Sequence, residues 1–414
     1  MAIDSQRTEP DLRLARDGGS PARTGPERPM FPGGMEVGDE ELHALERVIR
    51  SRNLFRYYGV GDGPNEVASF ERELAEHLGA GHALCVNAGS SALICGLIGS
   101  GVGRGDEVII PAYTWNATAN AVLATGALPV LAEVDDSLTL DPADVERRIT
   151  PRTRALLPVH MRGNAANMRA LVEIAERHGL ALVEDVCQAA GASFEGRRLG
   201  TFGDAGAFSL QFNKIITTGE GGAMITNRRD LYELAIEVHD CAGPVRHGSD
   251  LPRFPGWNFR ASELTGAVAR VQLTRLDGLL ERMRAHHARL AAAVAQLPGL
   301  TLRRSNDAAG DAGIALIAYA ESAALAAEAA AALQAEGVPA VLMYSPEVVD
   351  LHFYPFWRPV LDAIAAAGMP APDCPRTLDL VGRAVHVDVA PQLDDRDLDE
   401  LELALRKVAL GVHV

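Results

Sequence analysis

Lysine is almost absent from this chain. Lysine and arginine together number 39 among the 414 residues, but only two of them, Lys214 and Lys407, are lysines. Such a bias replaces lysine by arginine wherever either residue serves, so a lysine kept in mid-chain indicates chemistry that a guanidinium cannot perform. A partly desolvated amine can lose its proton and attack a carbonyl carbon to form a Schiff base, whereas arginine stays charged. Lys407 lies near the end of an amphipathic terminal helix and is expected to be structural, which leaves Lys214 as the candidate nucleophile.

Positive charge, paired cysteines and long apolar runs are also scarce. The net charge of −16 argues against nucleic acid and anionic membranes as partners, because both require a basic surface. The five cysteines are scattered without a C-x-x-C pair, so we expect reduced thiols and no metal site. No signal-peptide pattern is visible, and Glu321 and Glu328 interrupt the alanine-rich run near 315–335, so a cytoplasmic location is expected.

The order of elements predicts an α/β protein. Strand-like and helical runs alternate from about 80 to 227, as in a mostly parallel sheet with helices on both faces. Further on, IALIAYA, a helix ending before Gly337, and VPAVLMY suggest a β-α-β piece of a second domain. We expect a flexible arm over 1–30, a large domain over 31–275 and a small domain over 276–414. Apolar periodicity predicts helices over 39–51, 64–78, 261–297 and 395–408.

Lys214 is predicted to lie on a loop between two strands. The short apolar runs AFSL and AMIT flank it, and the polar segment between them ends in Gly219-Glu220-Gly221-Gly222, which must turn sharply. Loops held by a rigid sheet are where catalytic side chains concentrate.

Two further signals accompany Lys214. GLALVEDV is typical of a buried strand that ends in Glu184-Asp185, and an acid at the carboxyl end of such a strand points into the ligand crevice. The small-residue turn from Ala88 to Ser91 opens a helix whose N-terminus can hold a phosphate. Each signal alone is common, since an Asp after a strand is often only a helix cap. Together they match the contacts of pyridoxal phosphate: an imine, a partner for the pyridine nitrogen and a phosphate anchor.

The chain also resembles a known family. Its motifs are NAGSSAL, GDEVIIPAYTWNATANAV, PVHMRGNAANM, VEDVCQAAGA, GTFGDAGAFSLQFNKIITTGEGGAMIT and GWNFRASELTGAVARVQL. In this order and spacing they are similar to those of the DegT/DnrJ/EryC1/StrS sugar aminotransferases, from about Phe31 to Val408. The resemblance implies the aspartate-aminotransferase-like fold type I, with a mostly parallel seven-stranded sheet and a smaller α/β C-terminal domain.

The resemblance assigns roles to single residues. Lys214 would form the imine and move the proton between the donor Cα and the cofactor's C4′, while Asp185 would pair with the pyridinium nitrogen. Gln188 resembles the position that approaches the cofactor's face and 3-hydroxyl. Trp115 would stack on the cofactor ring, although packing in the core is an alternative reading of this residue.

The phosphate contacts and the assembly follow from the same resemblance. Gly89 and Ser90 would meet the phosphate through backbone and hydroxyl, and Ser209 would donate another hydrogen bond. Asn258 resembles the asparagine that reaches the partner's phosphate across a dimer interface, so a homodimer with shared active sites is expected.

Three stretches depart from the family pattern. The phosphate turn has Ala-Gly-Ser-Ser where relatives have Ser-Gly-Thr or Asn-Gly-Thr, and MYSPEVVDLHFYPFWRP and HVDVAPQL replace commoner substrate segments. The two substrate segments, unlike the phosphate turn, leave the identity of the acceptor substrate undetermined. His160 and Arg162, which follow an apolar strand in PVHMRG, are expected to be structural.

The resulting expectation is a ping-pong aminotransferase. It would move an amino group from glutamate or glutamine to a keto group on a nucleotide-linked sugar or a cyclitol, in secondary-metabolite or cell-surface sugar biosynthesis. One alternative is the related C-3 sugar dehydratase, but histidine typically replaces the lysine there. The other is a regulatory homologue that binds the cofactor without turnover, against which the complete set of site residues speaks.

Overall fold

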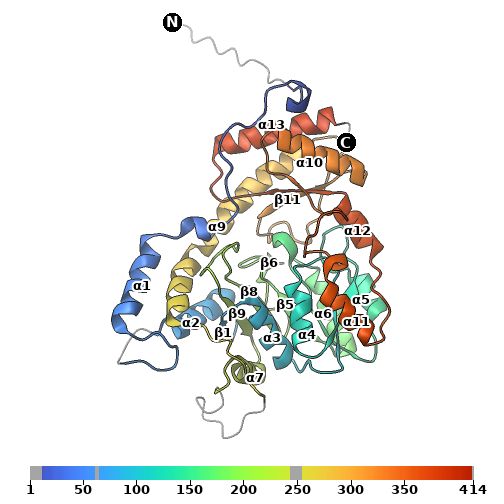
Figure 1. Ribbon diagram of the computed structural model, residues 1–414. Helices are drawn as coiled ribbons and strands as arrows, with labels where there is room; N and C mark the ends of the chain where they lie inside the picture. The colour runs from blue at the N-terminus through green and yellow to red at the C-terminus, as the bar shows by residue number, and fades with distance from the viewer. Residues whose placement is uncertain (1–11, 61–64, 243–253, 413–414) are drawn as a thin grey trace.

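A seven-stranded sheet forms the centre of the protein (Figure 1). The computed structural model describes residues 12–60, 65–242 and 254–412. The strand order is β1-β9-β8-β5-β4-β2-β3, and β9 pairs antiparallel with both of its neighbours while the other pairs are parallel. The expected mostly parallel sheet is therefore confirmed. The strands are β1 (His82–Val86), β2 (Glu107–Pro111), β3 (Leu128–Ala132), β4 (Thr153–Leu156), β5 (Ala181–Asp185), β8 (Ala205–Ser209) and β9 (Gly222–Thr226).

Helices cover both faces of this sheet. Strand β1 shows why, because Ala83 and Cys85 point into one apolar core while Leu84 and Val86 point into the other. One core contains residues of α2 (Glu66–Leu78), α6 (Met168–His178) and α9 (Glu263–Val294). The other contains residues of α3 (Gly89–Gly99), α4 (Ala117–Ala124), α7 (Arg229–His239) and α11 (Arg358–Ala366). The remaining helices are α1 (Asp39–Ser51), α5 (Pro142–Arg148), α10 (Ala323–Ala335), α12 (Pro375–Gly382) and α13 (Asp395–Gly411).

Local capping explains the helix ends. The side chains of Asn65, Ser262 and Asp394 accept hydrogen bonds from the first turns of α2, α9 and α13. Gly79 ends α2 in a left-handed conformation, with φ of 71°. The four predicted helices are present: α1 has the expected bounds, and the other three differ from the expected ranges by up to three residues at an end.

A second, four-stranded sheet follows α9. Its strands, in the order β10-β11-β13-β12, all pair antiparallel. Strand β13 lies between β11 and β12, so the expected β-α-β piece is split by a strand from near the C-terminus. The expected domain boundary after residue 275 falls inside α9 and stays a prediction. The strands are β10 (Thr301–Leu302), β11 (Ala315–Tyr319), β12 (Val341–Leu342) and β13 (Ala384–Asp388).

Residues 12–30 pack against this second unit, beside α10 and α13 (Figure 1). Leu14 is buried in its core, and the buried Arg23 donates a hydrogen bond of 2.8 Å to Asp397. This packing differs from the flexible arm expected over residues 1–30, of which residues 1–11 lie outside the described residues. The composition of residues 12–30 did not indicate this packing, because the residues that they contact lie near the other end of the chain.

Lys407 anchors the same segment. Its side chain is fully buried on α13, where its amine forms an ion pair with Glu336 and donates a hydrogen bond of 2.7 Å to the Ser20 carbonyl. The Glu336 carboxylate also accepts hydrogen bonds from the backbone N–H groups of Ala15 and Ala22. The second lysine is therefore structural, as expected, but through a buried charge pair.

Replacing Lys407 by methionine should lower the free energy of unfolding by about 3–5 kcal/mol, because the Glu336 charge would stay buried without its partner. Denaturant unfolding measures this loss. The neighbouring exposed Arg406 is the control, since Arg406→Met should change stability by less than about 0.5 kcal/mol. Equal effects of the two substitutions would contradict the buried pair.

Within the described residues, no helix is both long and apolar enough to cross a membrane.

Candidate active site

Lys214 lies on the hairpin connection between β8 and β9, as the sequence predicted. The segment is tied down by its backbone, because Lys214 N–H donates to the Gln211 carbonyl and its own carbonyl accepts from Gly33 N–H. The side chain is half-buried, and no ion pair or hydrogen bond of its amine is present among the described residues. An amine without a structural partner is available for covalent chemistry, in contrast to that of Lys407.

Asp185 stands at the carboxyl end of β5, in the strand next to β8. It is only 4% exposed, and its two oxygens accept hydrogen bonds from Cys187 N–H at 3.1 Å and from the Thr118 hydroxyl at 2.9 Å. Glu184 points to the other face of the sheet, where it accepts hydrogen bonds from backbone N–H groups, including that of Gly200. Of the predicted pair Glu184-Asp185, only Asp185 therefore lies on the side of the candidate site.

Lys214 and Asp185 both lie near the thiol of Cys187. Burial raises the pKa of the Cys187 thiol well above its ordinary value, and the Asp185 charge adds to this effect while the Lys214 charge opposes it. The two candidate catalytic groups thus act on the same thiol, which stays protonated and inert.

Gly89 opens helix α3 at the same place. A Cβ at Gly89 would lie 2.8 Å from the Cβ of Ser209 and 2.9 Å from Cys187 Sγ, so only glycine fits. The preceding residue, Ala88, provides no capping side chain, which leaves the first N–H groups of α3 available for an anion. Ser90, half-buried on the first turn, supplies a hydroxyl beside them.

Trp115 lies on the rim of the site. The residue is 44% exposed, which argues against the core-packing alternative. The imidazole of His352 packs against it, with ring centroids 5.0 Å apart. The two segments are joined by a hydrogen bond from Thr114 N–H to the His352 carbonyl.

His352 belongs to the site, although sequence reasoning did not select it. Its pKa is lowered first by burial and further by the charges of Arg162 and Lys214, while Asp350, which contacts Nδ1 at 2.7 Å, opposes the shift. The neutral ring is thereby favoured at pH 7. The only signal in the sequence was the position of LHFYPF near a family substrate segment.

Gln188 follows Asp185 and faces PVHMRG. Its Oε1 accepts a hydrogen bond of 3.1 Å from Arg162 N–H. His160, in the same motif, is fully buried, with Nε2 3.2 Å from Glu184 and Nδ1 accepting from Ala166 N–H. His160 therefore has the structural role expected, whereas Arg162 lies beside a candidate cofactor residue.

Asn258 lies near the phosphate turn of its own chain. It is exposed, and its carbonyl accepts a hydrogen bond of 3.3 Å from the Asn87 side chain. Its expected reach to the phosphate site of a second chain stays a prediction.

The arrangement fits pyridoxal phosphate. Lys214 would provide the amine, Asp185 a buried carboxylate for the ring nitrogen, Trp115 an aromatic face, and Gly89 with Ser90 and Ser209 the phosphate cradle. No group of three or more potential metal ligands occurs among the described residues.

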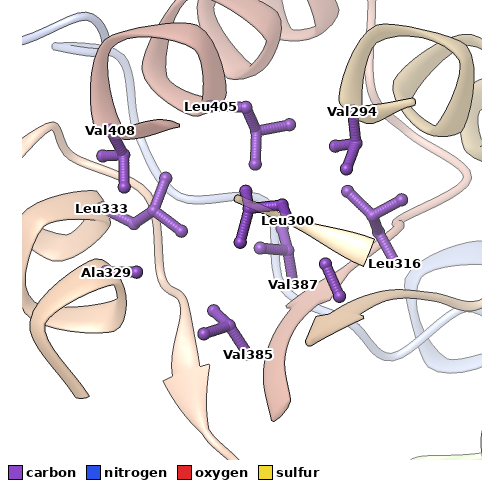
Figure 2. Close-up of a pocket in the computed structure, with 10 residues that line it drawn as sticks. Val294, Leu300, Leu316, Ala329, Leu333, Val385, Val387, Leu405 and Val408 are labelled. Atoms are coloured by element: carbon purple, nitrogen blue, oxygen red, sulfur yellow. The ribbon is translucent and has the colours of Figure 1, made fainter. Parts of the chain in front are cut away.

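A cavity elsewhere in the molecule is not a competing site. Figure 2 shows it between the second sheet and α10 and α13, with a volume of about 20 Å³. Its walls are aliphatic side chains such as Leu316, Leu333 and Val387, with no polar group to orient a ligand. It is a packing void.

The chain matches the model of the DegT/DnrJ/EryC1/StrS aminotransferase family over residues 36–406. It is 39% identical over 306 residues to L-glutamine:2-deoxy-scyllo-inosose aminotransferase of Streptomyces kanamyceticus, covering 71% of this chain and 70% of that one. It is 30% identical over 390 residues to the spore coat polysaccharide biosynthesis protein SpsC of Bacillus subtilis, covering 91% and 96%.

A solved structure agrees with this match. The crystal structure of S. venezuelae DesV, in complex with a ketimine intermediate, has 34% sequence identity and a TM-score of 0.76, and the match covers 89% of this chain and 94% of DesV. The chain therefore belongs to the DegT/DnrJ/EryC1/StrS aminotransferase family, whose members depend on pyridoxal phosphate.

Proposed function

We propose that this enzyme transfers the α-amino group of glutamine or glutamate to the keto group of a cyclitol or a nucleotide-linked sugar. The observation that carries the proposal is the meeting of Lys214, Asp185 and the uncapped start of α3 at one edge of the sheet. Relatives named for a glutamine donor and a keto-cyclitol, or for dTDP- and GDP-linked sugars, support the substrate class. The pathway would be secondary-metabolite or cell-surface sugar biosynthesis, in the cytoplasm.

The acceptor class is also supported by the arginines of the C-terminal part. An α-amino-acid transaminase commonly uses an arginine there to clamp a second carboxylate. Here Arg376 is paired with Asp141 and Arg383 with Asp379, while Arg358 has an 89% exposed side chain. None of these three arginines provides a clamp for a carboxylate of the acceptor, which favours an acceptor that binds through hydroxyl groups by many weaker hydrogen bonds.

The residues divide the work as follows. The cofactor, when bound, supplies an electron sink for the donor's Cα–H bond. Lys214 takes the proton at the donor Cα and returns one to the cofactor side, and repeats this in reverse for the acceptor. Asp185 would keep a positive charge on the ring nitrogen, because its carboxylate is buried and fixed by Thr118 and Cys187. Trp115 would cover the ring and limit access of water.

We also propose a homodimer in which Asn258 of one chain completes the phosphate site of the other. Light scattering on the purified protein should give twice the chain mass. A monomer with full activity would exclude shared sites.

The acceptor should be a bulky polyhydroxylated ketone. Enzyme loaded with pyridoxamine phosphate should be oxidised rapidly by an inosose or a keto-sugar nucleotide, and at least about 10-fold more slowly by pyruvate or oxaloacetate, which lack the hydroxyl contacts. Stopped-flow absorbance of the cofactor measures both rates. The 2-oxo acid of the donor is the positive control, since its reaction reverses the donor step. Fast turnover of pyruvate with none of any keto sugar or cyclitol would place the enzyme in ordinary amino-acid metabolism.

A further inference from the structure

Arg162 has an unusual backbone. It lies in a short 3-10 turn, Met161–Gly163, with φ of 50° and ψ of 42°. A long side chain rarely adopts this left-handed conformation, and such strain persists where the surrounding structure imposes it, often at ligand sites.

The surroundings hold this backbone from two sides. Arg162 N–H donates to Gln188 Oε1 at 3.1 Å, and the guanidinium of Arg303 donates to the carbonyls of Met161 and Arg162 at 3.2 and 3.4 Å. These bonds link the position of Arg162 to Gln188, which lies three residues after Asp185 in the sequence.

The Arg162 side chain has a buried polar atom without a hydrogen-bond partner in the described part of the chain. Its Nε is buried and has no hydrogen-bond partner among the described residues, and the same holds for the hydroxyl of Tyr113, a fully buried residue. The two side chains lie close together, because a hydrogen-bonding contact and the charge between them contribute to the pKa of each. Since neither the buried Nε nor the buried hydroxyl has a hydrogen bond of good geometry to a described residue, both can turn to a ligand that satisfies them better.

Nearby carboxylates do not take this role. Asp350 accepts hydrogen bonds from His352, and Asp388 lies 3.1 Å from His386. Neither carboxylate forms an ion pair with Arg162 among the described residues.

Arg162 also belongs to the active site. His352 is close enough to both Arg162 and Lys214 for the two cations to lower its pKa, and its ring packs on Trp115. An amino donor that reacts beside Lys214 carries its α-carboxylate on the same carbon as its amino group. The cation that meets this carboxylate must therefore lie near Lys214 without being Lys214.

We infer that Arg162, with the Tyr113 hydroxyl beside it, binds the α-carboxylate of the amino donor. A planar guanidinium can grip a carboxylate through two parallel N–H donors, which fixes the donor's orientation as well as its affinity. The inference rests on the proposed function, which requires an α-amino acid as donor. It assigns Arg162 a substrate-binding role where the motif alone suggested a structural one.

The test is the binding of a donor analogue that cannot react. Glutaramate is glutamine without its α-amino group, and isothermal titration calorimetry with the holoenzyme gives its Kd. Arg162→Gln should raise this Kd by about 10- to 100-fold, since a charge-assisted contact is lost. Arg162→Lys should recover part of the affinity, because it keeps the charge but not the fork. Glutarate, which is glutamate without its α-amino group, is titrated in parallel to test glutamate as the donor.

Matched controls separate binding from folding. Arg358→Gln removes an exposed arginine of the same charge and should leave the Kd unchanged. If Arg162→Gln fails to fold, Tyr113→Phe carries the test, since it removes one oxygen and keeps the ring stacked on Phe353, 5.2 Å away. That variant should weaken glutaramate by about 3- to 10-fold.

Kinetics give the second readout. Arg162→Gln should raise KM for the donor by a similar factor and leave the acceptor half-reaction within about 3-fold of the wild type. An unchanged Kd and KM, no binding of either analogue to the wild type, or a defect confined to the acceptor half-reaction would each overturn the inference. If no amino acid aminates the cofactor on the wild-type enzyme, the proposed function itself fails.

Discussion

Replacing Lys214 by arginine should abolish transamination and leave the fold intact. The amine of Lys214 has no structural partner among the described residues, so its loss costs little stability. A guanidinium stays protonated at neutral pH and cannot take a proton from the donor Cα. The rate of the donor half-reaction should fall by at least about 10²–10⁴-fold, the range for loss of a general acid–base group, as measured by single-turnover absorbance.

Peptide mapping tests the same assignment independently. Borohydride reduction of the holoenzyme should fix the cofactor on the peptide that contains Lys214. Lys407 is the internal control, because its fully buried, ion-paired amine should remain unlabelled. A label on Lys407, or on neither lysine, would rule out the assignment.

Asparagine at position 185 should cost activity without costing stability. The amide has nearly the same shape. Its oxygen can still accept from Cys187 N–H, and its NH2 group can donate to the Thr118 hydroxyl, which now donates to an Asp185 oxygen. The amide is neutral, however, and cannot hold a positive charge on the cofactor ring. We expect kcat to fall by about 10²–10³-fold, comparable to the loss of another preorganised electrostatic contact.

The adjacent acid provides the matched control. Glu184→Gln removes charge from a buried carboxylate that accepts hydrogen bonds from the backbone of Gly200, Phe202 and Gly203. It should lower the free energy of unfolding by about 1–3 kcal/mol and leave kcat nearly unchanged in the folded fraction. A similar loss of kcat in both variants would remove the distinction between the two acids.

The elements that could be predicted from the sequence are those with local signals. Helix α1 is bounded as its apolar spacing indicates, and α13 begins at Asp395, the first residue of the predicted helix. The hairpin that carries Lys214 and the strand that ends in Asp185 also follow from short patterns of apolar, polar and glycine residues. Family motifs then supplied the fold type and the cofactor.

The rest depends on contacts between distant segments. Nothing near Leu14 or Arg23 in the sequence indicates that residues 12–30 pack on α13, and nothing near His352 places it against Trp115. The strained backbone of Arg162 and its missing partners are properties of the folded chain alone. Periodicity and motif spacing describe single elements and carry no information on such pairings.

The pairing of β5 with β8 has a consequence for laboratory evolution. Because Asp185 lies directly opposite Ala207, the acid and the hairpin that carries the nucleophile reach the site from adjacent strands, held about 4.8 Å apart by the sheet. The segment around His352 enters from a separate part of the chain. Libraries confined to the exposed residues 346–349 could therefore explore new acceptors, while every member keeps the side chains that contact Trp115 and Tyr113.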